Sequence, residues 1–292
     1  MSRQRSRIAP LVGAVLVAVA AVAIGVAQAR TAAPDPVPGQ ALPRYDHVVV
    51  VIFENKNYDQ MVGSPYAPYF NQLAGEGALL TQSYGVTHPS QGNYLALYSG
   101  STQNVNGDNC PNTYRADHLG NQLIDAGFTF MAYSENLPQV GFTGCQSING
   151  LYVRKHAPWV NFVGFDQSLH VPFSQFPAGY SQLPTVSFVI PNICDDMHNC
   201  DIQVGDTWLR QHLDGYVQWA KTHNSLLITT FDEDDFTSAN QIYTSFVGEG
   251  VPQQKYDKQV NHYSVLRTLE DMYGLPPLGF AADSEAVDVF GP

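Results

Sequence analysis

Uninterrupted apolar runs recur along the chain and predict buried β-strands. They span residues 47–53 (HVVVVIF), 128–133, 185–190 and 226–231, and a weaker fifth run spans 242–247. Apolar runs that do not alternate with polar residues suit a sheet that is covered on both faces. Such a sheet usually consists of parallel strands with helices outside them. The pattern therefore predicts a mostly parallel central sheet.

Amphipathic segments between the apolar runs predict helices. In residues 206–222, apolar side chains fall on one face of a helix, from Trp208 and Leu209 to Ala220. The alternation of strands and helices indicates a doubly wound α/β domain, in which ligands bind beyond the carboxyl ends of the strands. The predicted helices span residues 66–76, 93–100, 117–126, 206–222 and 261–273.

The first 29 residues have the pattern of a secretory signal peptide. A basic segment precedes an apolar run, and Ala27-Gln28-Ala29 provides small residues before a cleavage site. The alternative is a membrane anchor, although the apolar run is shorter than the roughly 20 residues that span a bilayer. Residues 30–43 are rich in proline and predict a linker, which leaves residues 44–292 as a single domain. We expect a secreted, extracellular protein without a stable membrane anchor.

Secretion changes the interpretation of the four cysteines, Cys110, Cys145, Cys194 and Cys200. An even number of cysteines in an exported chain indicates disulfides, and four of them allow three pairings. Pairing Cys110 with Cys145 and Cys194 with Cys200 closes the shortest loops, and we predict that arrangement. A zinc site is the alternative, but the chain has no pair of cysteines separated by two residues.

Composition and charge exclude several classes of protein. The chain has 292 residues, of which 44% are hydrophobic and 14% charged, so it can bury a sizeable core. Its net charge of −12 excludes bulk electrostatic attraction to nucleic acid or to an anionic membrane. A phosphate-bearing substrate must therefore be held by a local site. We expect a monomer with no nucleic-acid partner.

Oxygen-bearing side chains follow three of the predicted strands near the point where each strand ends. Glu54 and Asn55 follow the first strand, Asn192 and the pair Asp195-Asp196 follow the third, and Asp232 and Glu233 follow the fourth. Adjacent carboxylates repel one another unless a cation or hydrogen bonds compensate. Oxygen ligands without thiolates favour a hard divalent cation such as Ca²⁺, Mg²⁺ or Mn²⁺ over Zn²⁺. The alternative is a solvated acidic loop, above all for the two aspartates that follow Glu233.

A predicted turn places a serine at the start of a helix. Pro89 and Gly92 indicate the turn, and Asn93 opens the helix. The hydroxyl of Ser90 would lie at a helix N-terminus, which suits a nucleophile that attacks an anionic phosphorus atom. Taken alone, a serine at this position is more often a helix cap. Thr87 is a second candidate for the nucleophile.

Four histidines and one lysine are candidates for proton transfer or phosphate binding. His198 lies in the loop that a Cys194–Cys200 disulfide would close, and His262 begins the last predicted helix. Either imidazole could protonate a leaving group. His88 precedes the serine turn, and Lys155 and His156 belong to a basic run that could contact a phosphate. The alternative for each histidine is a structural or exposed role.

Six sequence elements together resemble a known family. Their order and spacing are similar to those of the secreted bacterial acid phosphatase and phosphoesterase family, which includes phospholipase C-type enzymes and belongs to the alkaline phosphatase superfamily. The nearest resemblance is to actinobacterial phosphatases that act on phosphatidylinositol 3-phosphate. The elements are FENKNYD (53–59), THPSQGNYLALYSG (87–100), RKHAPWVNF (154–162), SFVIPNICDDMH (187–198), TTFDEDD (229–235) and NHYSVLRTLEDMYGL (261–275).

The resemblance implies an alkaline-phosphatase-like α/β fold with helices on both faces of the sheet. It also implies a metal site, a serine nucleophile and two histidines that assist. Gly92 is a departure, since many diester-cleaving relatives have proline there, and the glycine should leave the turn freer. The residues that match these roles are Glu54, Asn55, Asp232 and Glu233 for the metal, Ser90 for the nucleophile, and His198 and His262 as assisting groups. We predict in addition that Asn93, His88, Lys155 and His156 bind the substrate.

These observations lead to one hypothesis and two alternatives. The hypothesis is hydrolysis of phosphate monoesters through a phosphoserine intermediate, with a protonated imidazole donating to the leaving group. Activity should then fall above about pH 7, past the usual imidazole pKa. The first alternative is a phospholipase C-type phosphodiesterase. The second is a secreted binding protein that Ca²⁺ stabilises and that has no catalytic role.

Overall fold

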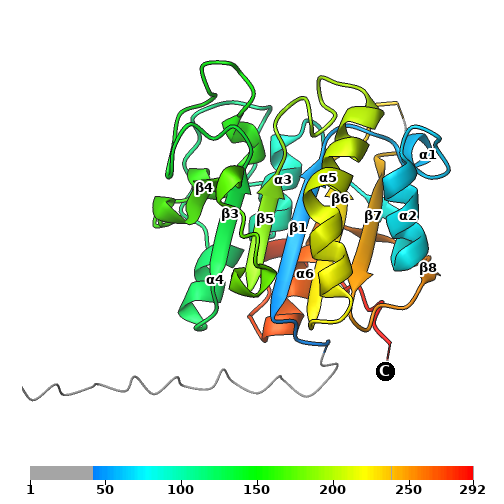
Figure 1. The fold of residues 1–292 in the computed structure, drawn as a ribbon. Coiled ribbons are helices and arrows are strands. Elements are labelled where there is room, and N and C mark those ends of the chain that lie inside the picture. The colour runs from blue at the N-terminus through cyan, green and yellow to red at the C-terminus, as the bar shows by residue number, and fades with distance from the viewer. Residues whose placement is uncertain (1–41, 238, 292) are drawn as a thin grey trace, which may run out of the picture. The chain divides into compact units, whose positions relative to one another are not determined.

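A mixed β-sheet forms the centre of the computed structural model, which describes residues 42–237 and 239–291. Its strands lie in the order β4-β3-β5-β1-β6-β7-β2-β8, and β9 pairs with β2. Figure 1 views this sheet face-on. The strands are β1 (His47–Phe53), β2 (Ala78–Tyr84), β3 (Phe130–Ser134), β4 (His170–Pro172), β5 (Val186–Ile190), β6 (Ser225–Phe231), β7 (Gln241–Gly248), β8 (Gln254–Tyr256) and β9 (Val260–Asn261).

Five neighbouring strands, from β4 to β6, are parallel, as the apolar runs predict. The apolar run at residues 242–247 also forms a strand, β7, but β7 is antiparallel to both β6 and β2. The reason is the connection, residues 232–240. A parallel neighbour needs a crossover of roughly a dozen residues or more, and this connection is shorter. The mostly parallel α/β fold is confirmed, with one reversed strand.

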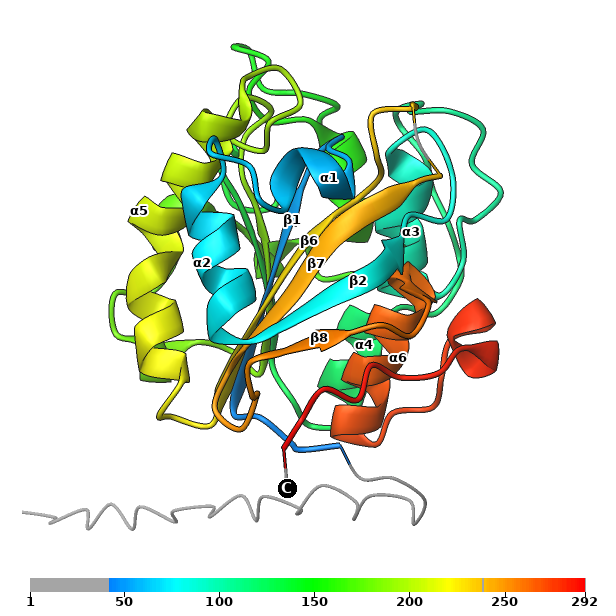
Figure 2. The same ribbon diagram turned by 90° about the vertical axis from the view of Figure 1, so that its right-hand side faces the viewer.

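Helices cover both faces of the sheet (Figure 2). Helices α1, α2 and α5 pack on one face, where Val49 and Val51 of β1 point, while α3, α4 and α6 pack on the other, with Val48 and Val50. The alternation of side chains along a strand explains why β1 is apolar throughout. The helices are α1 (Tyr58–Met61), α2 (Pro68–Glu76), α3 (Gln91–Ser99), α4 (Leu119–Asp125), α5 (Ile202–Ala220) and α6 (His262–Tyr273).

The predicted helices all exist, with ends that differ by a few residues. The predicted apolar face of α5 is buried from Trp208 and Leu209 to Ala220. The sequence pattern missed α1 and four strands, β2, β4, β8 and β9. In β2, only the first three residues form an apolar run, and the other three strands are two or three residues long. Such short elements carry no detectable periodicity.

Both predicted disulfides are present, Cys110–Cys145 and Cys194–Cys200. The alternative of a zinc site on these cysteines is therefore wrong. The predicted signal peptide (1–29) and the predicted linker (30–43), apart from its last two residues, lie outside the described residues. Within the described part of the chain, no helix is both long and apolar enough to cross a membrane.

Candidate active site

The carboxyl ends of β1 and β6 bring the predicted oxygen ligands together. The two strands are adjacent and parallel, with Phe53 paired to Phe231, so Glu54 and Asp232 leave the sheet side by side. The main-chain N–H of Asn55 donates to Oδ1 of Asp232 at 3.3 Å. Asn55 has a φ of 52°, a left-handed conformation that asparagine tolerates better than most residues. The register of two buried strands therefore builds this cluster.

Ser90 lies between two of these carboxyl groups. Its Oγ is 3.0 Å from Oε2 of Glu54 and 3.0 Å from Oε1 of Glu233. The residue precedes α3, but its side chain makes no capping hydrogen bond, and only 1% of it is exposed. The alternative role as a helix cap therefore does not describe this serine. Its hydroxyl belongs to the carboxylate cluster.

The three carboxyl groups of the cluster, Glu54, Asp232 and Glu233, are buried close together, which disfavours their charged forms. Burial raises the pKa of Glu54 and of Asp232, and the charge of Glu54 raises that of Asp232 further. Burial and the charge of Glu54 raise the pKa of Glu233 to about 8. Ser90 has one hydroxyl hydrogen, so it donates to only one of its two carboxyl partners at a time. The other charge must be balanced by a proton or a cation.

Unpartnered oxygen atoms at this edge fit a cation. Oδ2 of Asp232 and Oδ1 of Asn55 are both buried and have no hydrogen-bond partner. Buried polar atoms are usually satisfied, so these two are available to a ligand. Both are hard oxygen donors, the kind that Ca²⁺, Mg²⁺ and Mn²⁺ prefer. The predicted set of Glu54, Asn55, Asp232 and Glu233 therefore fits a hard divalent cation.

A second group of three side chains could also hold a metal ion. Glu54, His156 and Asp196 are buried and offer ligand atoms that all lie within 4.8 Å of one another. Nε2 of His156 is 3.0 Å from Oε1 of Glu54, and Nδ1 is 3.1 Å from Oδ2 of Asp196. Yet Nε2 of His156 and Oδ2 of Asp196 make no hydrogen bond. Glu54 is common to both groups.

Aromatic stacking holds His156 behind Glu54 and away from the surface. Its ring stacks on Tyr94 with the centroids 5.1 Å apart, and the hydroxyl of Tyr94 donates to Oε1 of Glu54 at 2.5 Å. Burial lowers the pKa of His156 to about 4 and raises that of Asp196 to about 7. The structure thus places His156, a predicted substrate-binding residue, beside the carboxylates.

Lys155 is a partly buried cationic side chain near the carboxyl groups, as is Lys56, whose Nζ donates to the main-chain oxygen of Met197 at 2.8 Å. Nζ of Lys155 donates to Oδ2 of Asp108 at 2.8 Å and lies 3.4 Å from Nε2 of His198. The other oxygen of Asp108 accepts from the main-chain N–H of Gln91, directly after Ser90. Burial acts to lower the pKa of Lys155, but the charges of Glu54 and Asp108 outweigh it and raise the pKa. Asp108 thus joins the lysine to the first turn of α3.

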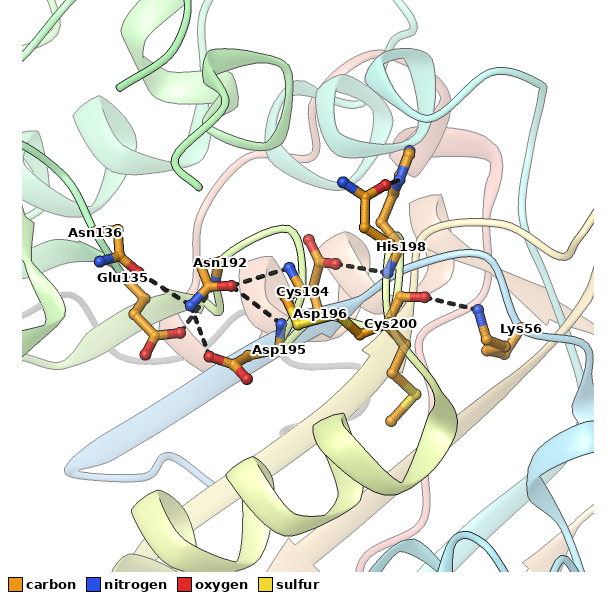
Figure 3. Close-up of a disulfide and its surroundings, with 11 residues drawn as sticks. Lys56, Glu135, Asn136, Asn192, Cys194, Asp195, Asp196, His198 and Cys200 are labelled. Carbon is orange, nitrogen blue, oxygen red and sulfur yellow. Dashed lines mark hydrogen bonds between the residues drawn. A yellow bond between two sulfur atoms is a disulfide. The ribbon is translucent and has the colours of Figure 1, made fainter. Parts of the chain in front are cut away.

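The Cys194–Cys200 disulfide closes the loop that carries His198, as Figure 3 shows. The main-chain N–H of His198 donates to Oδ1 of Asp196 at 2.8 Å. Asn192 fixes the start of the loop, since its Oδ1 accepts from the main-chain N–H groups of Cys194 and Asp195. The backbone on both sides of the His198 ring is therefore held, and the half-buried ring faces Lys155.

The turn before α3 is held by Asn93 and not by Ser90. Oδ1 of Asn93 accepts from the main-chain N–H groups of Val86 and Thr87, and its Nδ2 donates to the carbonyl of Thr87. Thr87 Oγ1 donates to the neighbouring carbonyl of His88. A Cβ at Gly92 would lie 2.5 Å from Cγ2 of Thr87, so the glycine permits tight packing. This is the opposite of the expected freer turn.

His88 and His262 occupy different environments. Nδ1 of His88 is 2.5 Å from Oε2 of Glu233, and the imidazole is partly exposed. His262 is buried at the start of α6, and its Nε2 contacts the main-chain oxygen of Asp232 at 2.5 Å. Burial lowers the pKa of His262 to about 4. The structure therefore places both histidines against the acidic segment after β6, with His262 buried next to Asp232 and His88 partly exposed next to Glu233.

Three side chains to which the sequence pattern assigned no role also lie at the site, namely Tyr94, Asp108 and Asp196. Asp196 belongs to the acidic run after the third predicted strand and stands two residues before His198, so its position was visible in the sequence. Tyr94 follows Asn93 in a helix whose residues are all buried, so its hydroxyl had no distinctive signal. Asp108 lies in a loop far from any predicted strand. Only the folded chain brings it to Lys155.

Comparison with known proteins places the chain in a family. The model of the Phosphoesterase family matches residues 64–276. A phosphatidylinositol-3-phosphatase from Mycobacterium tuberculosis is 48% identical over 255 residues, which cover 86% of this chain and 85% of that protein. An acid phosphatase from Aspergillus fumigatus is 30% identical, over 78% of this chain and 55% of its own length. The chain belongs to the Phosphoesterase family and is a phosphoester hydrolase.

Solved structures with the same fold belong to the alkaline phosphatase superfamily or resemble it. A member of this superfamily from Vibrio parahaemolyticus has a TM-score of 0.58 and 14% identity, over 86% of this chain and 72% of that one. A lipoteichoic acid synthase from Listeria monocytogenes also has a TM-score of 0.58, with 11% identity over 85% of this chain and 76% of its own. The predicted alkaline-phosphatase-like fold and the predicted family are confirmed.

Proposed function

We propose that the protein hydrolyses phosphate monoesters and that Ser90 is its nucleophile. The observation that carries the proposal is the position of the Ser90 hydroxyl, 3.0 Å from a carboxyl oxygen of both Glu54 and Glu233. A buried hydroxyl between two carboxyl groups has partners that can accept its proton as it attacks. The relatives, which are a phosphatidylinositol-3-phosphatase and acid phosphatases, support the same reaction class.

The reaction divides into two displacements at phosphorus. In the first, Ser90 Oγ forms a bond to phosphorus, its proton passes to a carboxylate of the cluster, and the ester oxygen leaves as the alcohol after it accepts a proton. In the second, water attacks the phosphoserine, inorganic phosphate leaves, and Ser90 regains a proton. Lys155 would bind the phosphoryl oxygens, and its ammonium group donates to Asp108.

We assign the protonation of the leaving group to His198. Burial lowers the pKa of His156 and of His262 to about 4, so neither carries a second proton at pH 5–6. His198 is half-buried, and its ring lies beside Lys155. His262 then has a different role, which is to hold the main chain of Asp232 in place.

Glu54, Asn55, Asp232 and Glu233 would hold a hard divalent cation. When bound, the cation would lower the pKa of the serine hydroxyl and neutralise charge on the phosphoryl group. The unpartnered oxygens of Asn55 and Asp232 support this assignment. If His156 and Asp196 also bind metal with Glu54, the nitrogen ligand extends the choice of metal to Zn²⁺.

The proposal extends to the substrate and the compartment. The 48% identity to a phosphatidylinositol-3-phosphatase makes phosphatidylinositol 3-phosphate the first lipid substrate to assay. Two disulfides support secretion, because disulfides persist in oxidising compartments. Removal of residues 1–29 as a signal peptide and a monomeric state are part of the same proposal.

The experiment measures phosphate release and the phosphoenzyme together. Wild type, Ser90→Ala and Thr87→Val are assayed at pH 5–6 with a phosphomonoester, and an acid quench with radiolabelled substrate traps covalent phosphate. We expect Ser90→Ala to lose at least about a thousandfold in kcat, with no trapped phosphate, because the attacking oxygen is gone. Thr87→Val should keep the label.

Two other outcomes would redirect the assignment. Activity that survives in Ser90→Ala but disappears in Thr87→Val would make Thr87 the nucleophile. Faster turnover of a phosphate diester than of the matching monoester would indicate the phospholipase C-type reaction. A folded wild type with no activity on either, with Ca²⁺, Mg²⁺ or Mn²⁺ added, would contradict the proposal.

A further inference from the structure

Phe236 is an exposed aromatic side chain at the rim of the site, and the fold does not require it there. It is 60% exposed, although a phenyl ring gains most from burial. Its φ is 67°, in the left-handed region of backbone conformation that residues other than glycine, asparagine and aspartate rarely adopt. A strained backbone that presents an apolar ring to solvent needs an explanation outside the stability of the core.

Hydrogen bonds fix the backbone around Phe236. Its main-chain N–H donates to Oδ1 of Asp234 at 2.8 Å, while Oδ2 of Asp234 accepts from the N–H of Asn240 at 2.8 Å. Asp234 is fully buried, and the main-chain N–H of Asp235 donates to Oδ1 of Asn57. Hydrogen bonds therefore fix the backbone that carries the phenyl ring, while most of the side chain remains exposed to solvent.

A short chain of contacts joins Phe236 to the nucleophile. Its ring stacks on His88, with the centroids 4.1 Å apart and the planes at 28°. Nδ1 of His88 is 2.5 Å from Oε2 of Glu233, whose Oε1 is 3.0 Å from Oγ of Ser90. Two side chains thus separate the phenyl ring from the nucleophile.

Two chains of contacts lead away from Ser90 and differ in character. One is polar and runs from the main-chain N–H of the neighbouring Gln91 through Asp108 to Lys155, which lies beside His198. The other runs through Glu233 to the partly exposed ring of His88, which stacks on Phe236. A phosphate monoester also has two different parts, a charged phosphoryl group and an ester group. Lys155 and His198 suit the phosphoryl oxygens, and the aromatic pair suits an apolar or flat ester group.

We propose that Phe236, stacked on His88, is a specificity-determining residue that binds the ester group of the substrate and favours esters with a flat ring near the phosphate. The inference rests on the proposed phosphomonoesterase activity. A stacked or edge-to-face contact between Phe236 and a ring of the substrate should raise kcat/KM roughly three- to tenfold over that of a substrate without a ring. A small alkyl group cannot make this contact, so the preference belongs to the ester group and not to the phosphate.

The test compares two substrates whose leaving alcohols have similar basicity, benzyl phosphate and ethyl phosphate. We expect Phe236→Ala to lower kcat/KM for benzyl phosphate roughly three- to tenfold more than for ethyl phosphate. Phe236→Tyr, which keeps a ring, should retain the wild-type ratio. Phe280→Ala is the matched control, because Phe280 is also exposed (58%) but lies away from Ser90. Its main-chain N–H donates to the carbonyl of Gly100, which follows the last residue of α3, whereas Ser90 precedes the start of this helix.

Each other outcome has a distinct meaning. An equal fall for both substrates would make Phe236 a support for His88 and overturn the proposal, as would no change for either. If Phe236→Ala fails to fold, Phe236→Leu gives the same comparison, since leucine fills the space without a ring. Wild-type hydrolysis of either ester supports the proposed function whatever the ratio. Hydrolysis of neither would remove the proposed function and this inference together.

Discussion

Buried carboxyl groups with the same pKa occupy two regions of the molecule. Burial raises the pKa of Glu233, at the carboxyl edge of the sheet, and of Glu270, in α6, to about 8. Glu233 also feels the charge of Glu54 and faces the hydroxyl of Ser90. Glu270 has a structural partner, since its Oε1 accepts from the main-chain N–H of Leu278 at 2.8 Å.

The comparison shows that a raised pKa does not by itself identify a functional carboxyl group. Glu270 stands apart from the Ser90 cluster and ties α6 to the segment that follows it. Glu233 is one of two carboxyl groups that contact one hydroxyl from the ends of different strands. Glu270 also has a buried oxygen without a partner, Oε2, so it is the convergence on a hydroxyl that separates the site from a buried structural acid. The next three predictions test this distinction.

The largest effect is expected for Glu233→Gln. Glutamine keeps an acceptor for Ser90 but cannot ionise. Because the pKa of Glu233 is raised to about 8, its carboxylate form at pH 5–6 depends on a bound cation, and that form is what could bind the cation and accept the serine proton. We expect kcat to fall about a hundred- to ten-thousandfold. After chelation, added Ca²⁺, Mg²⁺ or Mn²⁺ should raise the melting temperature of the wild type more than that of the variant. Equal metal stabilisation of both proteins would show that Glu233 is not a ligand.

An intermediate effect is expected for Asp108→Asn. Asparagine can still accept from the N–H of Gln91 through Oδ1, but its amide nitrogen cannot accept from Lys155. We expect the less restrained lysine to raise KM about tenfold, since a hydrogen bond to a charged group contributes about 1.5–3 kcal/mol. The change in kcat should be smaller. Asp117→Asn, on the same loop and exposed, is the control for charge. A lower KM in Asp108→Asn would mean that Asp108 competes with the phosphate.

The smallest effect on activity is expected for Glu270→Gln. The folded pKa of Glu270, about 8, lies above the ordinary value of 4.5, so its stabilising contribution is complete below pH 4.5 and is lost as the pH rises through 8. Glutamine has no proton to lose. We expect the unfolding free energy of the variant relative to that of the wild type to increase between pH 5 and 8, by up to about 1.4 kcal/mol per pH unit. The difference between their melting temperatures should increase accordingly. Turnover should not change.

A difference that stays constant with pH would contradict the assignment of Glu270 as a buried, protonated group. Glu285→Gln provides the control, because Glu285 is highly exposed and near α6 in the sequence. A fall in turnover for Glu270→Gln equal to that for Glu233→Gln would remove the distinction between the two regions.

The apolar runs predicted the sheet and the edge at which the site lies. They predicted both ends of β1, because all but the first of its seven residues are buried and its side chains pack on both faces of the sheet. The closeness of Glu54 and Asp232 followed from the same pattern, because they come directly after adjacent strands. The disulfide pairing was also accessible, since only three pairings exist and the shortest loops are those formed.

The tertiary structure decided the environment of each histidine and the side chains that surround it. Sequence position does not show which ring nitrogen meets which neighbour, and so His156 and His262, which are buried, could not be separated from His198, which is half-buried. The contact between Asp108 and Lys155 joins two loops that are 47 residues apart. Local patterns reflect burial and turns, because those depend on neighbouring residues. Contacts between distant loops depend on the whole fold and leave no periodic signal in the sequence.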